Sequence, residues 1–157
     1  MSGRERLERY LRENGVSYEV EEHPTAYTAQ KIAATEHVPG RMFAKVVMAT
    51  TNGDLVMLVL PAPSVVDVGK VAEVVGEDVR LASESEFATT FADCEPGAMP
   101  PFGNLYDLPV YVDLALGRNE RIVFQAGTHS VTMSVAYADF ERLTGPTVAD
   151  IAVARSA

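Results

Sequence analysis

The stretch Phe43–Pro61, FAKVVMATTNGDLVMLVLP, predicts a β-hairpin around which the rest of the chain is organised. Two apolar runs, residues 43–49 and 55–60, flank Thr51-Asn52-Gly53-Asp54. Asn-Gly is the pair that best tolerates the positive φ angles of a tight hairpin turn. Both runs are apolar at consecutive rather than alternate positions, which indicates strands that are covered on both faces. The hairpin is therefore expected in the middle of a sheet.

Lys45 interrupts the first apolar run, between Ala44 and Val46. An ammonium group in such a strand must reach water, find an anion or lose its proton. The chain has only three lysines, so Lys45 is not part of a general basic coat. Two interpretations stay open. The side chain packs its stem and extends its head to solvent, or it is a cation at the floor of a pocket that meets an anionic or carbonyl oxygen.

The segment before the hairpin predicts two helices and a short strand. Ser2 and Glu5 fit a capping box that opens a helix with an apolar face, ended by Gly15. Residues 16–20 alternate as a strand does, and His23-Pro24 closes it. A second helix is expected from Thr28 to about Thr35, followed by a turn at Pro39-Gly40.

The segment after the hairpin predicts a helix capped by Ser64, with Asp67 at the capping-box position and Gly76 as its end. A second capping box at residues 83–86 opens a helix to about Phe91. Strands are expected at residues 79–82, 109–114, 121–125 and 130–135, and a last helix ends at Gly145-Pro146. The whole chain, residues 1–157, is interpreted as a single α+β domain. Its mixed, mostly antiparallel β-sheet or barrel is surrounded by four to five helices.

Composition narrows the classes of function. The 157 residues are 47% hydrophobic and 22% charged, and no apolar run approaches the roughly 18–20 residues of a membrane span. The N-terminus lacks an apolar signal core, and the single Cys94 excludes an internal disulfide, so we expect a cytoplasmic protein. A net charge of −9 disfavours nonspecific grip on long nucleic acids, but not recognition of a short end.

One basic cluster stands out, formed by Arg4, Arg6, Arg9 and Arg12. Its spacing fits the solvent face of a helix, and a contact with RNA is the alternative.

The sequence lacks the residue patterns that several common catalytic mechanisms require. The three histidines, His23, His37 and His129, are scattered and do not offer metal-ligand spacing, so no metal or other cofactor is expected. The sequence has no G-x-S-x-G elbow, no Walker loop and no G-x-G-x-x-G after a strand. Cys94 lies beside Asp93 and Glu95, whose carboxylates would raise the thiol pKa, so it is interpreted as inert.

Two loops could carry chemistry. Residues 97–103 could present backbone N–H groups to an oxygen, as an oxyanion site does. Prolines at 100 and 101 cannot donate, so the available donors are Gly97, Ala98, Met99, Phe102 and Gly103. A rigid surface turn is the alternative. In the second loop, residues 127–130, an imidazole lies beside two hydroxyls, and His129 is either functional or a satisfied structural histidine.

Together these pieces resemble the YbaK/prolyl-tRNA synthetase editing-domain superfamily, the free-standing aminoacyl-tRNA deacylases. The likeness runs from about Leu7 to Leu143. It rests on an ordered set of motifs: His23-Pro24 with Thr28, FAKVV at 43–47, a G-x-x-x-P loop at 97–101, FQAGTHS at 124–130 and Ala138-Asp139-Phe140.

The resemblance implies hydrolysis of the ester between a wrong small amino acid (alanine, cysteine or serine) and tRNA, most often tRNA for proline. It implies no metal and no covalent intermediate. It marks Lys45, Gly97, Pro101 and His129 as candidate catalytic residues. The candidate substrate-binding residues are His23, Thr28, Ala98, Met99, Phe102, Gly103, Gly127 and Ser130.

The acidic surface predicts weak, salt-sensitive binding limited to the acceptor end of tRNA, or delivery by an aminoacyl-tRNA synthetase partner. Two other functions remain open. The chain could be a non-catalytic module that holds a tRNA end or a protein, or a hydrolase of another activated ester.

Overall fold

A computed structural model describes residues 1–24 and 38–154, and its centre is the expected hairpin. Strand β2 (Ala44–Thr51) pairs antiparallel with β3 (Asp54–Pro61), and Thr51 lies opposite Asp54. The turn residues Asn52 and Gly53 have φ angles of 51° and 79°. Positive φ at both positions is the requirement that Asn-Gly meets at low cost.

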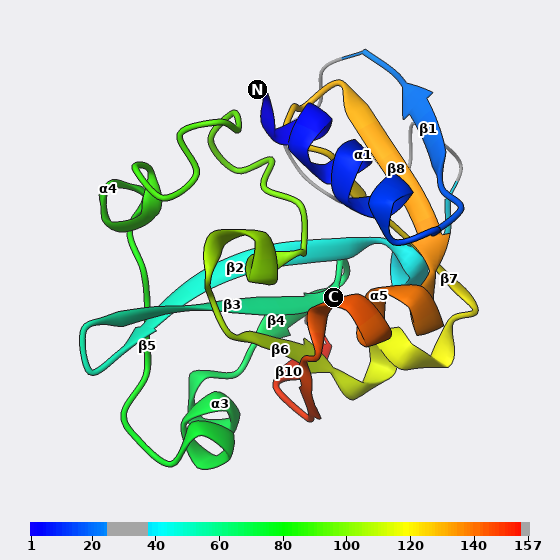
Figure 1. Ribbon diagram of the computed structural model, residues 1–157. Coiled ribbons are helices and arrows are strands. Elements are labelled where there is room, and N and C mark those ends of the chain that lie inside the picture. The colour runs from blue at the N-terminus through cyan, green and yellow to red at the C-terminus, as the bar shows by residue number, and fades with distance from the viewer. Residues whose placement is uncertain (25–37, 155–157) are drawn as a thin grey trace.

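The hairpin lies inside a five-stranded mixed sheet of order β5-β2-β3-β6-β9 (Figure 1). The strands beside the hairpin are β5 (Arg80–Leu81) at one edge, β6 (Val110–Asp113), and β9 (Thr147–Ala149) at the other edge. Pairing is antiparallel from β5 to β3 and parallel from β3 to β9. This position confirms the prediction that the two apolar runs form central strands.

Both faces of the hairpin are covered. Met48, Met57 and Val59 face the main core, whereas Ala49 and Leu58 face a second cluster under helix α3 (Val68–Val75). The alternation of side chains along a strand sends neighbouring apolar residues to opposite faces, which explains why the runs are continuously apolar.

A second, antiparallel sheet has the order β1-β8-β7 and consists of β1 (Glu19–Glu22), β8 (Val131–Ala136) and β7 (Arg121–Gln125). A parallel bridge between Phe43 and Val123 connects it to the start of β2. A third pair joins β4 (Ser64–Val66) to β10 (Ala152–Ala154). Among the described residues the sheets stay open, so the fold is the expected mixed sheet and not a closed barrel.

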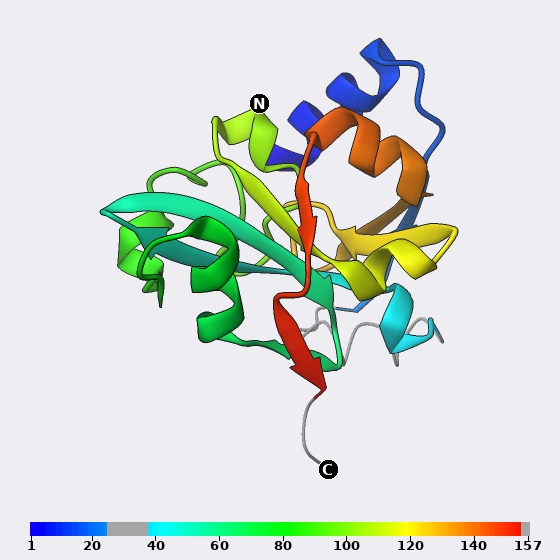
Figure 2. The same cartoon turned by 90° about the horizontal axis from the view of Figure 1, so that it is seen from below.

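Four α-helices fall within residues 1–24 and 38–154, in agreement with the expected number. Helix α1 (Gly3–Glu13) begins with the capping box of Ser2 and Glu5, and α5 (Tyr137–Thr144) lies beside it (Figures 1 and 2). The others are α3 and the short α4 (Glu84–Phe87). The same residues include three 3-10 helices: η1 (Gly40–Met42) before β2, η2 (Gly103–Tyr106) before β6, and η3 (Leu114–Arg118) between β6 and β7. No helix in this part of the chain combines the length and apolarity needed to cross a bilayer.

The main core joins helices to both sheets. Leu7 and Leu11 of α1 are fully buried in it. Phe102 makes edge contacts with Phe124 and Phe140, with ring centroids 5.5 and 5.6 Å apart. Burying each such side chain contributes about 1.5–3 kcal/mol, so α1 is held to the second sheet mainly by its apolar face.

Several predicted boundaries were wrong. Residues Ser64–Val66 form strand β4 rather than a helix start, because they pair with β10 near the C-terminus. The helix begins after Asp67, whose side chain accepts a hydrogen bond from the Lys70 N–H at 3.1 Å. Helix α4 ends at Phe87 instead of continuing to Phe91. The predicted helix from Thr28 lies outside the described residues.

Candidate functional site

A row of polar side chains crosses four strands, β2, β7, β8 and β1, at the junction of the two large sheets. Because Phe43 is bridged in parallel to Val123, Lys45 and Gln125 lie two residues further along on the same face of neighbouring strands. Gln125 is opposite Thr132 in β8, and Thr132 is opposite Glu21 in β1. The fold therefore brings together residues 45, 125, 132 and 21, which are far apart in sequence.

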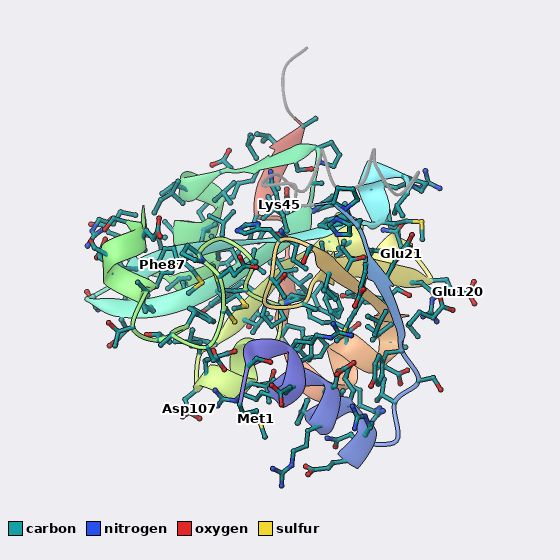
Figure 3. The ribbon with its side chains drawn as sticks, turned by 90° about the horizontal axis from the view of Figure 1, so that it is seen from above. Met1, Glu21, Lys45, Phe87, Asp107 and Glu120 are labelled. Atoms are coloured by element: carbon teal, nitrogen blue, oxygen red, sulfur yellow. The ribbon has the colours of Figure 1, made fainter. Side chains whose placement is uncertain are left out.

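Lys45 is half-buried in this row, and its Nζ donates a hydrogen bond to the backbone oxygen of Ala62 at 3.1 Å (Figure 3). Gln125 and Thr132 are 8% and 1% exposed. Sequence reasoning missed both as site residues, although each is a polar residue that alternates with apolar core positions in its strand. Buried polar groups need partners, so this face is a specific polar environment.

A cavity of about 270 Å³ opens on this face. Its wall includes Thr132 and Ser134 of β8, Val38 and Val123, and the two carboxylates of Glu19 and Glu21. This volume suits a small ligand rather than a large cofactor.

The two loops predicted to carry chemistry are joined to one another. The Gly127 N–H donates to the Ala98 oxygen at 2.9 Å, and the Glu95 N–H donates to the Gly127 oxygen at 2.8 Å. Gly97 and Gly127 have φ angles of +81° and +93°. A Cβ at residue 127 would lie 3.1 Å from the backbone nitrogen of Arg4, so close packing also requires glycine there.

His129 connects the polar row to the G-x-x-x-P loop. Its Nε2 lies 2.6 Å from the Pro96 oxygen, so Nε2 carries the proton and donates, and Nδ1 accepts from the Gln125 amide at 3.2 Å. The ring is 5% exposed. The His129 backbone N–H donates to Glu95 Oε1 at 3.0 Å, and this bond is the main reason that the pKa of Glu95 is lowered. The arrangement fixes the position of Gly97.

The remaining predicted site residues separate into two groups. His23 is next to the second loop, since its N–H donates to the Ser130 oxygen at 3.0 Å, and Ser130 and Thr128 hydroxyls are 2.9 Å apart. Met99 and Phe102 belong to the core, and a Cβ at Gly103 would lie 2.8 Å from Val110. In that half of the loop the side chains serve packing. Pro101 is buried, and Thr28 lies outside the described residues.

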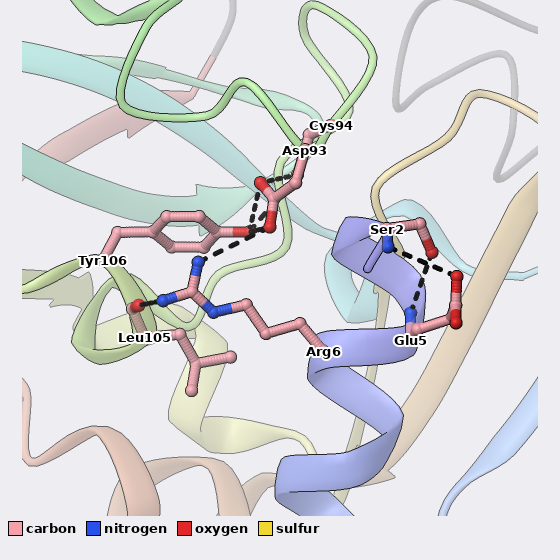
Figure 4. Close-up of polar contacts among 7 residues, drawn as sticks. All are labelled: Ser2, Glu5, Arg6, Asp93, Cys94, Leu105 and Tyr106. Atoms are coloured by element: carbon pink, nitrogen blue, oxygen red, sulfur yellow. Dashed lines mark hydrogen bonds and ion pairs between the residues drawn. The ribbon is translucent and has the colours of Figure 1, made fainter.

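A third set of contacts fixes the loop from the other side (Figure 4). The Tyr106 hydroxyl donates to Asp93 Oδ1 at 3.0 Å, Arg6 Nη1 lies 3.5 Å from Asp93 Oδ2, and the Arg6 guanidinium lies 4.5 Å above the Tyr106 ring. Arg6 also donates to the Leu105 oxygen. Helix α1 is thereby connected to the residues that precede Gly97.

Cys94 lies within this set, 3.4 Å from the Tyr106 hydroxyl. Burial, more than the charge of Asp93, raises the pKa of the Cys94 thiol to about 11. The predicted direction was right, but the larger cause is desolvation. Within the described residues, no group of three His, Cys, Asp or Glu side chains gathers in a way that could hold a metal ion.

Comparison with known proteins shows the family of this chain. The model of the aminoacyl-tRNA editing domain matches residues 23–143. The chain belongs to the aminoacyl-tRNA editing domain family. No curated protein matches it.

Solved structures share the editing-domain fold at low sequence identity. One is a protein proposed to be a trans-editing enzyme for prolyl-tRNA synthetase, with 22% identity, a TM-score of 0.85 and 99% of each chain covered. Another is a hypothetical protein, with 19% identity, a TM-score of 0.86 and coverage of 94% of this chain and 99% of that one.

The match to the editing-domain family begins at residue 23, after helix α1. Nevertheless, α1 supplies Arg6 to the contacts that hold the loop before Gly97, and its backbone at Arg4 packs against Gly127. The support of both loops therefore comes partly from a helix outside the matched residues.

Proposed function

We propose that this editing-domain protein is a free-standing deacylase that hydrolyses the ester between a mischarged small amino acid and tRNA, in the first place tRNA for proline. One observation carries the proposal: Lys45 lies in a polar row that is coupled through Gln125 and His129 to the Gly97 loop. Membership of the editing-domain family supports it. We place the activity in the cytoplasm, with an aminoacyl-tRNA synthetase as a partner that delivers the substrate.

The chemistry needs little from the protein, because an aminoacyl ester is already reactive. It requires a positioned water, donors for the developing oxyanion and a cation near the terminal ribose or phosphate. The backbone N–H groups of Gly97 and Met99 supply the donors in this proposal, and Lys45 supplies the cation. The Ala98 N–H, expected from the sequence to be available, instead donates to the Glu95 oxygen at 3.0 Å. A ribose hydroxyl of the terminal adenosine can orient the water, so no covalent intermediate is needed.

His129 acts as a positioning residue in this mechanism. Both of its ring nitrogens contact the protein, at the Pro96 oxygen and the Gln125 amide, which favours a supporting role over proton transfer. Replacing the ring would release the carbonyl beside Gly97, and the oxyanion donors would lose their alignment.

Substrate size is set by the cavity beside the polar row. A wall with Val38 and Val123 favours a small apolar side chain, and Glu19 and Glu21 favour the α-ammonium group of an aminoacyl ester. Apolar pockets separate substrates that differ by one methylene by only about 1–3 kcal/mol. Alanine, serine and cysteine esters are therefore expected to overlap as substrates.

The test is deacylation of tRNA for proline charged separately with alanine, cysteine, serine and proline. Wild type should hydrolyse at least one mischarged ester and leave prolyl-tRNA intact, and Lys45→Ala should lose that activity. Lys70→Ala is the matched control. Lys70 lies outside the polar row, and its Nζ is 3.1 Å from Asp150 Oδ1. Retention of activity in Lys45→Ala would contradict the mechanism, and no turnover of any ester would leave a binding module in its place.

A further inference from the structure

We propose that Arg41, Arg118 and Arg121 form a phosphate-binding surface beside the candidate site. This arginine patch holds the backbone of the RNA strand that leads to the aminoacylated end. The inference rests on the proposed function for the identity of the RNA, but its geometry is independent of the chemistry.

The three arginines are brought together by the contact between η1 and η3. Asn119 Nδ2 donates to the Arg41 oxygen at 2.9 Å, which fixes the residue after Arg118 against η1. Helices η1 and η3 contact one another, and Figure 2 shows the cyan η1 beside the yellow η3. Arg121 begins β7, and its Nη2 donates to the Ser134 hydroxyl at 3.0 Å. Ser134 also lines the cavity, so the patch borders the site.

The arginines of the patch differ from the other described arginines of this acidic chain in that they lack a carboxylate partner. Within residues 1–24 and 38–154, a carboxylate oxygen lies within 4.0 Å of each of the others: Arg4, Arg6, Arg9, Arg12, Arg80 and Arg142. None is found within that distance of residues 41, 118 and 121 in the same part of the chain. Arg41 and Arg118 are exposed, and Arg121 is half-buried.

Two acidic residues near the patch form no ion pair with it in the described part of the chain. Glu120 lies between Arg118 and Arg121, is exposed and uses its backbone oxygen to accept from the Tyr137 N–H (Figure 3). Glu19 is opposite Ser134 in the neighbouring strand. A guanidinium without a bound carboxylate keeps its planar fork available for two phosphate oxygens.

The spacing suits the strand of RNA next to the reacting ester. Arg121, Val123 and Gln125 share one face of β7, and four residues of strand cover about 13 Å. The patch is therefore about 13 Å from the row that contains Lys45. That distance reaches the phosphates of nucleotides before the terminal one, and not the ester itself.

The expected contribution is modest. Three phosphate contacts to a single strand correspond to a slope of about −2 in log affinity against log salt. Such a contact adds local affinity without making a chain of net charge −9 a general nucleic-acid binder. The patch thus removes the conflict between an acidic protein and an RNA substrate.

The test compares two triple variants with equal charge change. The patch variant combines Arg41→Gln, Arg118→Gln and Arg121→Gln. The control variant combines Arg9→Gln, Arg12→Gln and Arg142→Gln. Anisotropy measures binding of uncharged tRNA between 50 and 200 mM salt. Over that range, wild-type affinity should fall about 20-fold more than that of the patch variant, whose slope is smaller by about 2. The control should keep the wild-type slope.

A second substrate separates binding from chemistry. Hydrolysis of an aminoacyl-adenosine, which cannot reach the patch, should be unchanged in the patch variant, whereas kcat/KM for aminoacyl-tRNA should fall at least tenfold. Equal losses for both substrates, equal slopes in the two variants, or a loss confined to binding of purified prolyl-tRNA synthetase would each overturn the RNA contact. If wild type hydrolyses nothing but the slopes differ as expected, the proposed function fails and the patch stands.

Discussion

Two groups of arginines in this molecule have opposite environments. Those of helix α1 lie close together in sequence, and each has a carboxylate within 4.0 Å. Those of the arginine patch lie far apart in sequence, meet only in the folded chain, and have no carboxylate within that distance in the described residues. A basic cluster in the sequence therefore need not be a basic surface, and a basic surface need not be a cluster in the sequence.

The physical reason lies in helix spacing. Residues four apart on a helix are neighbours, so Glu8 pairs with Arg4 and Arg12, and Glu13 pairs with Arg9. Pairing of this kind at the surface contributes little to stability, but it removes the net charge that a phosphate would meet. The α1 arginines thus favour the helix-surface interpretation over the RNA contact.

The largest expected effect concerns the apolar face of α1 rather than its arginines. Leu7 is fully buried, so Leu7→Ala should lower the free energy of unfolding by about 2–5 kcal/mol. Urea denaturation measures the change, with Arg9→Gln as the control on the exposed face. A loss below about 1 kcal/mol would mean that ion pairs, and not the core, attach the helix.

Cys94 reports on the contact set of Arg6, Asp93 and Tyr106. Because burial raises the pKa of its thiol to about 11, the thiolate fraction at pH 8 is about 100-fold below that of an ordinary cysteine. Alkylation by iodoacetamide at pH 8 should be slower by about that factor and should accelerate as the pH approaches 11. A rate like that of unfolded protein would show that the cluster is open in solution.

Asp93→Asn tests the ion pair by which Arg6 connects α1 to the residues before Gly97. The change removes the charge opposite Arg6 and weakens the bonds from the Tyr106 hydroxyl, so it should cost about 2 kcal/mol after allowance for the 43% exposure of Arg6. Thermal unfolding measures the cost, and deacylation measures the displacement of the Gly97 loop. Arg9→Gln, which breaks a pair within the helix, should leave the loop and the activity unchanged.

Local patterns predicted most of the fold, and tertiary pairing explains the errors. The Asn52-Gly53 turn and the capping box at Ser2 depend on neighbouring residues, and both were confirmed. The predicted helix start at Ser64–Val66 was wrong, because this segment pairs with β10, which lies almost ninety residues later in the sequence. The C-terminal strands went unpredicted for the same reason: each is short and depends on a distant strand for its hydrogen bonds.

The candidate site likewise divides into residues that the local sequence indicates and residues that only the tertiary structure reveals. The G-x-x-x-P motif and Lys45 could be selected from the sequence, whereas Gln125 and Thr132 become site candidates only through the bridge between Phe43 and Val123. The Pro96 partner of His129 was likewise not visible, because the two residues meet through loop geometry.

The smallest expected effect decides whether the two groups of arginines really differ. Arg9→Gln removes an i,i+4 pair with Glu13 and should cost about 0.3–0.5 kcal/mol of stability. Arg118→Gln removes no carboxylate contact and lowers repulsion within the patch, so its free energy of unfolding should equal or slightly exceed that of wild type. Paired urea titrations at low salt resolve the sign. If Arg118→Gln lost more than about 1 kcal/mol, Arg118 would be needed by the fold itself, and its guanidinium would not be available to a phosphate.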